Sequence, residues 1–127
     1  MTTHLFASVS RLRNPGLFYL YAMLAPGRTH GEVEAAIDAV VTSVKKNGVT
    51  EAEVQRAKNQ LRAQESFGRD GPFAIASQLN EAIAAGDWKL YTTIRSRIER
   101  VTAEDVQRVA TTYLAEDQRT VGTYVPV

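Results

Sequence analysis

The chain has 127 residues, of which 44% are hydrophobic, and its 15 basic and 14 acidic side chains leave a net charge of +1. This length predicts one domain or part of one, and the balanced charge excludes the basic surface of a nucleic-acid-binding or anionic-membrane-binding protein. The absence of cysteine excludes disulfides, thiolate nucleophiles and cysteine zinc sites. No apolar run approaches the roughly 18 residues of a membrane span, and residues 1–12 do not resemble a signal peptide. We expect a soluble protein, cytoplasmic or periplasmic, of unknown compartment.

The first predicted structure is a β-hairpin over residues 4–25. Residues 5–10, LFASVS, alternate in polarity, and residues 17–24, LFYLYAML, are rich in the side chains typical of a buried strand. Between them, Asn-Pro-Gly at residues 14–16 is a turn sequence, and Pro-Gly at residues 26–27 ends the second strand. This order predicts two paired strands.

Helical patterns then fill residues 29–116. Thr29 with Glu32, and Thr50 with Glu53, have the spacing of capping boxes, in which the threonine and glutamate side chains satisfy each other's backbone amides. Apolar residues recur behind each cap at helical spacing, which favours amphipathic helices. Residues 68–72, GRDGP, are expected to break or kink the second helix. We expect about five helical segments, which begin near Thr29, Thr50, Pro72, Trp88 and Thr102.

Residues 119–126, RTVGTYVP, predict a closing strand that Pro126 ends. Two strands, about five helices and one strand indicate an α+β fold with two layers. In it, a small, antiparallel-rich sheet carries helices on one face. The other face and the open edges of such a sheet invite pairing. The pattern therefore suggests a missing partner or a missing half.

Catalytic and metal-binding patterns are weak. His4 and His30 are the only histidines, whereas a catalytic zinc needs three converging protein ligands. His30, Glu32 and Glu34 together could form a helix-start site. The simpler interpretation, which we favour, is an exposed histidine beside two glutamates that suit the helix dipole. No nucleophile elbow or phosphate-binding glycine loop occurs. We assign no catalytic residue and no metal ligand.

Phe18, Tyr19 and Tyr21 are the candidate peptide-facing residues. Strand alternation places Phe18 on one face and the two tyrosines on the other. One interpretation is a surface to which an extended peptide adds as a strand, and the other is a strand buried on both faces. Trp88 likewise fits either a helix-start anchor in the core or a binding residue.

Five segments have a recognisable order and spacing between residues 13 and 126: PGLFY at 15–19, TEAEVQRAKNQL at 50–61, GDW at 86–88, VTAEDV at 101–106, and RTVGTYVP at 119–126. Together they resemble the carboxyl-terminal part of a non-catalytic domain of the insulinase-type zinc metallopeptidases. This is the family of pitrilysin and the mitochondrial processing peptidase. The zinc motif of that family, H-x-x-E-H, is absent from this chain.

The resemblance implies that residues 1–127 are a single, partial processing-peptidase-like domain, a little over half of one, without its early strands and first helices. In that family, paired domains enclose an unfolded peptide, and zinc and hydrolysis belong to the amino-terminal domain. Many members also supply an arginine and a tyrosine from the carboxyl-terminal domain. These lie just before the segment similar to residues 6–10, and neither role transfers to Thr3 or His4.

The resemblance therefore implies a non-catalytic fragment, inactive alone and without a cofactor of its own. It would contribute to the peptide-binding chamber and to pairing with a catalytic peptidase domain. A second hypothesis is a free-standing dimeric scaffold or adaptor, in which two copies join their incomplete sheets. A third, an independent hydrolase, predicts metal-dependent turnover by the chain alone, and two histidines make it the weakest.

Overall fold

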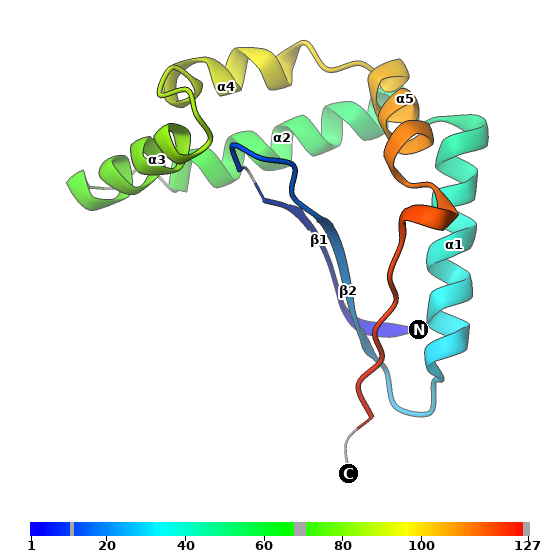
Figure 1. Ribbon diagram of the computed structural model, residues 1–127. Coiled ribbons are helices and arrows are strands. Elements are labelled where there is room, and N and C mark those ends of the chain that lie inside the picture. The colour runs from blue at the N-terminus through cyan, green and yellow to red at the C-terminus, as the bar shows by residue number, and fades with distance from the viewer. Residues whose placement is uncertain (11, 68–70, 126–127) are drawn as a thin grey trace. The chain divides into compact units, whose positions relative to one another are not determined.

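The computed structural model describes residues 1–10, 12–67 and 71–125 (Figure 1). Two strands pair in one sheet, and five α-helices and a short 3-10 helix follow them. This confirms the α+β class. In chain order the elements are β1 (Thr2–Val9), β2 (Phe18–Leu24), α1 (His30–Asn47), α2 (Glu51–Phe67), α3 (Pro72–Ala84), α4 (Leu90–Glu99), α5 (Ala103–Tyr113) and η1 (Glu116–Gln118).

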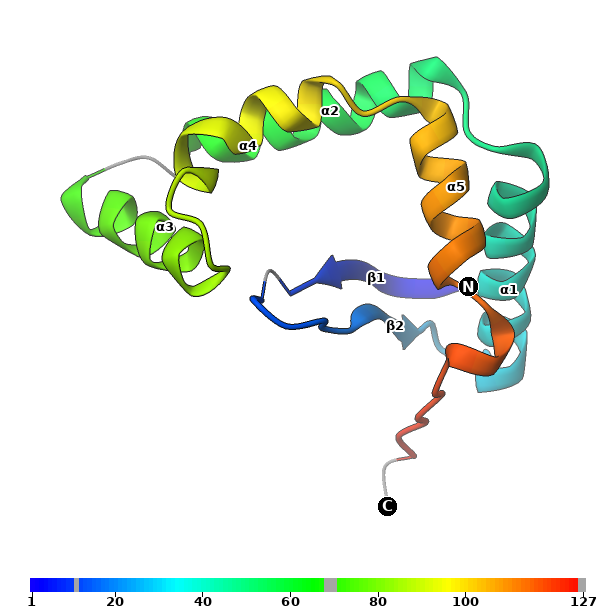
Figure 2. The ribbon, with the colours of Figure 1, turned by 45° about the horizontal axis from the view of Figure 1, so that its top comes forward.

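The described residues group into two compact units. The first takes in residues 1–6, 20–49 and those described from 103 onward, and the second takes in residues 7–19 and those described between 50 and 102. β1 and β2 pair as the predicted hairpin (Figure 2). Each strand contributes residues to both units. The amide of Ala25 donates to the carbonyl of Met1 at 3.1 Å, which closes the open end of the hairpin.

Helix α1 begins with the capping box that the sequence predicts. The Thr29 hydroxyl accepts from the Glu32 amide, and the Glu32 carboxylate accepts from the Thr29 amide at 2.9 Å. The helix ends at Gly48, whose φ of +73° is the left-handed conformation that glycine adopts without steric cost. A Cβ at this position would also meet the Gln107 side chain of α5 at 3.3 Å. Gln107 in turn donates to the Lys45 carbonyl at 3.1 Å, so the end of α1 is tied to α5.

An ion pair joins α2 to the end of α4 in the second unit. Arg62 donates through Nε and Nη2 to the two carboxylate oxygens of Glu99, at 2.6 and 2.5 Å. Lys58 Nζ donates to the Glu99 carbonyl at 2.9 Å. Bidentate arginine–carboxylate pairs fix orientation as well as distance. The two helices are therefore held in one register although 37 positions separate the partners.

The hydrogen bonds from Arg62 lower the pKa of the Glu99 carboxyl below its ordinary value of 4.5. Because the folded-state pKa lies below the unfolded-state pKa, the pair stabilises the fold fully above pH 4.5. Its contribution is lost as the pH falls through the lowered pKa. We therefore expect Glu99→Gln to lower the Tm at pH 7, and the difference from wild type to shrink progressively below pH 4.5. Thermal unfolding followed by circular dichroism at several pH values measures this. The exposed Glu116→Gln serves as the control, and a difference independent of pH would contradict the prediction.

Residues 119–125 correct one prediction, because they do not form the closing strand. Arg119 has extended backbone, with φ −104° and ψ 149°, but the sheet contains only β1 and β2 among the residues described. No amide of this segment donates to a described backbone carbonyl. A strand is defined by ladder hydrogen bonds to a neighbour, and none of the described strands pairs with this segment. Pro126, the predicted end of the strand, and residues 68–70 of the predicted helix break lie outside the described residues.

The core is small. Among the described residues only four hydrophobic side chains are buried, and no large side chain is fully buried. Val33 and Ala110 belong to the first unit, and Val54 and Ala82 belong to the second. Folding must offset about 1–2 kcal/mol of backbone entropy for each ordered residue, chiefly through apolar burial. A chain of this length with so few buried residues therefore has much apolar surface left to cover.

Candidate functional site

Strand β2 exposes the aromatic side chains that the sequence singles out. The exposed fractions of Phe18, Tyr19 and Tyr21 are 49%, 51% and 57%. The two faces of the strand are therefore both open in this chain, and burial of the strand on both faces by this chain alone is not observed. The assignment of these three side chains to a bound peptide stays a prediction.

The partner strand β1 adds to the same apolar surface. Leu5, Phe6 and Val9 of β1 are each more than half exposed, as are Tyr19 and Tyr21 of β2. Large exposed apolar patches mark interaction sites, and each of the two strands carries several exposed apolar side chains. We call the exposed apolar side chains of β1 and β2 the hairpin surface. It consists of Leu5, Phe6, Val9, Phe18, Tyr19, Leu20, Tyr21 and Met23.

The three residues of the hypothetical helix-start metal site face different partners. His30 Nε2 lies 3.2 Å from the Tyr124 carbonyl, Glu32 caps the helix, and Glu34 pairs with Arg119 at 3.2 Å. The hydrogen bond from the Thr29 amide lowers the pKa of Glu32, as expected for a capping carboxylate. Within the described part of the chain, no three histidine, cysteine, aspartate or glutamate side chains gather closely enough to hold a metal ion.

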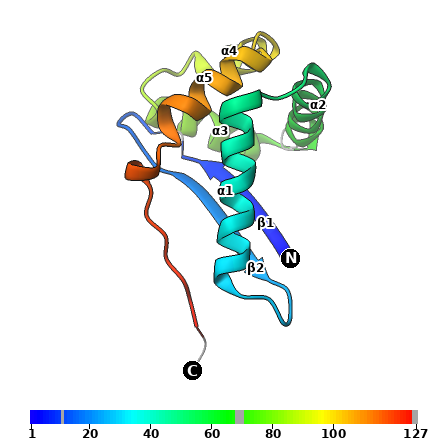
Figure 3. The same cartoon turned by 90° about the vertical axis from the view of Figure 1, so that its right-hand side faces the viewer.

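Arg119 fastens the terminal segment to α1. Its guanidinium forms ion pairs with Asp38 and Glu34, which lie one turn apart on the helix. The contact between His30 and the Tyr124 carbonyl makes a second attachment near the other end of the segment. Figure 3 shows residues 119–125 leaving η1 and running past α1. The acidic pair at positions 34 and 38 is visible in the sequence, but its basic partner lies 81 positions from Asp38 and only tertiary structure identifies it.

We expect Arg119→Ala to release this segment. Both charge-assisted contacts to α1 depend on one guanidinium, and no backbone ladder to another described segment replaces them. Backbone ¹⁵N order parameters of residues 120–125 are expected to fall from about 0.85 to below about 0.6. The matched control is Arg108→Ala, which removes an exposed local ion pair with Asp105 on α5. Order parameters that stay high in the Arg119 variant would show that other contacts hold the segment.

Trp88 lies just before α4 and is exposed rather than packed in the core. The Asp87 carboxylate accepts from the Lys89 amide at 3.0 Å, so the neighbouring aspartate supplies the polar contact at the helix start. Of the two interpretations of Trp88, the helix-start anchor in the core is therefore not observed as a buried side chain in this chain. Separately, none of the described helices is both long enough and apolar enough to cross a membrane.

Comparisons with known proteins identify the relatives of this chain. Residues 1–61 match the family model described as the peptidase M16 inactive domain. Over 66 residues the chain is 35% identical to the β subunit of the mitochondrial processing peptidase of Lentinula edodes. That match covers 51% of this chain but only 14% of the subunit.

Solved structures extend the likeness to almost the whole chain. The inactive peptidase domain of a candidate zinc protease from Bordetella parapertussis is 30% identical with a TM-score of 0.84, and the match covers 99% of this chain and 67% of that one. A candidate zinc protease from Bordetella pertussis Tohama I is 32% identical with a TM-score of 0.78, over 89% of this chain and 62% of that one. A Helicobacter pylori protease, 19% identical with a TM-score of 0.80, shares the fold over 92% of this chain and 28% of its own. The chain therefore belongs to the insulinase-type, or M16, peptidase family and corresponds to its inactive domain.

Proposed function

We propose that this chain is a non-catalytic part of an insulinase-type zinc peptidase that helps wall the peptide-binding chamber and pairs with a catalytic domain. The observation that carries the proposal is the hairpin surface, which leaves Phe18, Tyr19 and Tyr21 about half exposed. The small number of buried residues among those described supports the same conclusion, because it leaves much apolar surface that this chain does not cover itself. Apolar surface that this chain does not cover is surface that a partner or a peptide can cover.

The energetics favour such a partner. Full burial of a large apolar side chain is worth about 1.5–3 kcal/mol relative to leaving it in water. Several half-exposed side chains of the hairpin surface therefore supply a substantial driving force for association, even after its entropic cost. The open edges of a two-stranded sheet add unpaired backbone groups that also favour a partner.

An extended peptide fits the chemistry of a hairpin edge. Strand addition satisfies the backbone groups of the edge and of the peptide, while alternate side chains contact the exposed aromatic residues. The net charge of +1 gives no strong selection by peptide charge over the chain as a whole. This combination suits a chamber that accepts unfolded peptides of varied sequence.

Hydrolysis and zinc belong elsewhere in this proposal. The chain has no H-x-x-E-H motif, and its only histidines are His4 and His30. His30 and its neighbouring glutamates are already engaged in contacts that hold the terminal segment and the start of α1. A catalytic domain, in the same or another polypeptide, would supply the metal and the general base.

A free-standing dimeric scaffold is the second candidate. The same hairpin surface favours it, as does the segment at residues 119–125, which pairs with no described strand, because two copies could cover each other's exposed strands with twofold symmetry. This candidate requires no catalytic partner. It predicts a stable dimer at working concentration, whereas a clean monomer by light scattering excludes it.

Addition of the chain to a catalytic insulinase-type domain tests the proposal. We expect binding by calorimetry and faster cleavage of an unfolded peptide, while the chain alone stays inactive with or without zinc. Absence of binding together with a dimer by light scattering would favour the scaffold. Metal-dependent turnover by the chain alone would contradict both candidates.

The size of the polypeptide in its native source gives an independent test. An antibody to the segment around Trp88 would detect either a band near 14.0 kDa or a much larger one. A mass roughly three times larger, as expected for two full domains, supports a peptidase subunit. A 14.0 kDa band supports the free-standing scaffold.

A further inference from the structure

Helix α1 ends on an asparagine–glycine pair that lies outside the hairpin surface. Asn47 is the last residue of the helix and is exposed, and Gly48 follows it with a φ of +73°. Because glycine has no side chain, nothing on residue 48 shields the Asn47 carboxamide carbon from the Gly48 amide nitrogen. Each of the other asparagines precedes a proline, which has no amide proton, or a residue with a long side chain. These pairs are Asn14 before Pro15, Asn59 before Gln60 and Asn80 before Glu81.

The reaction open to this pair is a cyclisation followed by hydrolysis. The Gly48 nitrogen loses its proton and bonds to Cγ of Asn47, while Nδ2 takes up a proton and leaves as ammonia, so that a succinimide ring forms. Water then adds to one of the two ring carbonyls and opens the ring. The product is either aspartate or isoaspartate, in which the main chain runs through the former side chain. Water is the only co-reactant that the two steps consume.

The folded structure engages both nitrogens that take part in this reaction. The Gly48 amide donates to the Val44 carbonyl at 2.9 Å, and Nδ2 of Asn47 donates to the Ser43 hydroxyl at 3.2 Å. An amide that donates within the fold loses its proton only when the structure opens locally, as hydrogen exchange shows. The asparagine–glycine pair is therefore reactive by its sequence and restrained by the end of α1.

Helix α5 holds this end of α1 closed. Gln107 Nε2 donates to the carbonyls of Lys45 and Lys46 at 3.1 and 3.4 Å. In return, Lys45 Nζ donates to the carbonyl of Leu114, just after α5, at 3.2 Å. A side chain of each helix thus satisfies carbonyls that the end of the other helix leaves without an intrahelical partner. Both helices belong to the first unit, so the last turn of α1 opens only if contacts with α5 break.

We propose that Asn47 and Gly48 form a self-modification site, at which the chain converts asparagine to aspartate and isoaspartate, and that Gln107 sets the rate by holding the end of α1. The product opposes reclosure of the helix end. Loss of ammonia removes the donor to Ser43, and isoaspartate lengthens the main chain between Val44 and Gly48. Either product also adds a negative charge at the carboxyl end of α1, where the helix dipole disfavours it. Modification therefore weakens the α1–α5 junction irreversibly.

Peptide mass spectrometry on the full chain, incubated at neutral pH, measures conversion at each asparagine. We expect Asn47 to gain the mass that replaces an amide NH₂ by OH, while the other asparagines stay unchanged over the same period. Electron-transfer fragmentation separates isoaspartate from aspartate. Unfolding in guanidinium chloride is expected to raise the rate at Asn47 at least about tenfold, because the Gly48 amide is then no longer held as a donor.

Matched variants on α5 test the role of Gln107. Gln107→Ala should raise the rate in the folded chain about fivefold, because it removes the hydrogen bonds from this side chain to the end of α1. The control is Arg108→Ala at the next position, whose ion pair with Asp105 lies within α5, and its rate should equal that of wild type. The comparison of folded and unfolded wild type stays informative if Gln107→Ala does not fold.

Asn47→Gln tests the effect of the modification on stability. Its side chain is one carbon longer and would have to form a larger, less favourable ring, so conversion at this position should stop. The Tm of wild type should fall during incubation in step with the converted fraction, whereas the Tm of Asn47→Gln should stay constant.

Two results would overturn the inference: complete protection of Asn47 in the folded chain, or equal rates in the folded and unfolded chains. Equal rates in the Gln107 and Arg108 variants would overturn the role of Gln107. Conversion without a change in Tm would overturn the effect on the α1–α5 junction. These measurements need neither a catalytic domain nor a peptide, so they decide this site independently of the proposed function.

Discussion

Val33→Asp is expected to unfold the first unit, whereas Val40→Asp on the same helix is expected to leave it folded. Val33 is 5% exposed and is one of the four buried hydrophobic residues described, while Val40 is 63% exposed. An unpaired carboxylate at the buried position should cost at least about 3 kcal/mol, which is a large share of the stability of a small domain. Urea unfolding followed by far-ultraviolet circular dichroism measures the difference.

The comparison between the two valine variants carries the test, because both substitutions add the same charge to α1. Equal unfolding midpoints would show that Val33 contributes no core packing.

The Val40 variant also tests association with a partner. If its exposed side chain is covered by a partner, Val40→Asp should weaken association with a catalytic domain without changing the unfolding midpoint of the chain alone.

The double variant Tyr19→Ser and Tyr21→Ser is expected to raise the KM for peptide cleavage by the paired enzyme about tenfold, with little change in kcat. The two tyrosines alternate onto one face of β2 and are about half exposed, so their loss removes contact with a bound peptide and little internal packing. Steady-state kinetics on an unfolded peptide, with saturating chain and a catalytic domain, measures the effect.

Tyr113→Ser is the matched control, because it removes an exposed tyrosine from α5 instead of from the hairpin surface. It should leave KM and kcat unchanged. An unchanged KM in the double variant would show that the bound peptide does not contact these two tyrosines of β2. A loss of binding to the catalytic domain would instead assign the tyrosines to domain pairing.

Most of the local structure follows from the sequence. The hairpin, the starts of the five helices and both capping boxes agree with the predictions, and Thr50 and Glu53 make the same reciprocal contacts as Thr29 and Glu32. The helix starts and the capping boxes depend on residues within about four positions of one another, and the hairpin depends on two strands joined by one short turn. Caps and helical periodicity involve only such neighbours, so one sequence contains the whole interaction.

The predicted closing strand was wrong. Residues 119–125 have the β-branched and aromatic composition of a strand, and the sequence predicts one on that ground. A strand also needs a neighbour that supplies the other half of its hydrogen bonds, and no described strand does so. Composition reports the preference of the segment for an extended backbone, whereas strand pairing depends on a neighbouring strand.

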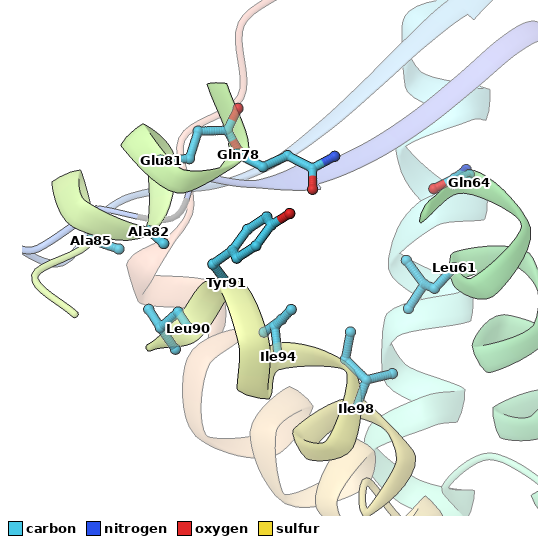
Figure 4. A pocket seen from close by; sticks show the side chains of 10 residues that line it. All are labelled: Leu61, Gln64, Gln78, Glu81, Ala82, Ala85, Leu90, Tyr91, Ile94 and Ile98. Carbon is cyan, nitrogen blue, oxygen red and sulfur yellow. The ribbon is translucent and has the colours of Figure 1, made fainter. Parts of the chain in front are cut away.

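The candidate sites divide in the same way. Phe18, Tyr19 and Tyr21 are recognisable in the sequence as an aromatic strand, but the choice between a buried and an exposed strand depends on whether other elements cover it. The open hollow lined by Ala82 of α3 and by Ala85, the residue that follows this helix, has no sequence signal of its own (Figure 4), because alanine indicates helix propensity before it indicates space.

The sequence by itself determined the α+β class, the helix caps, the absence of the zinc motif and the resemblance to the insulinase-type family. Each of these depends on residue types and on short spacings along the chain. Only the tertiary structure decided that the hairpin surface is exposed and that Arg119 pairs with α1. These features arise between residues far apart in the chain, and their free energy depends on which surfaces meet after folding.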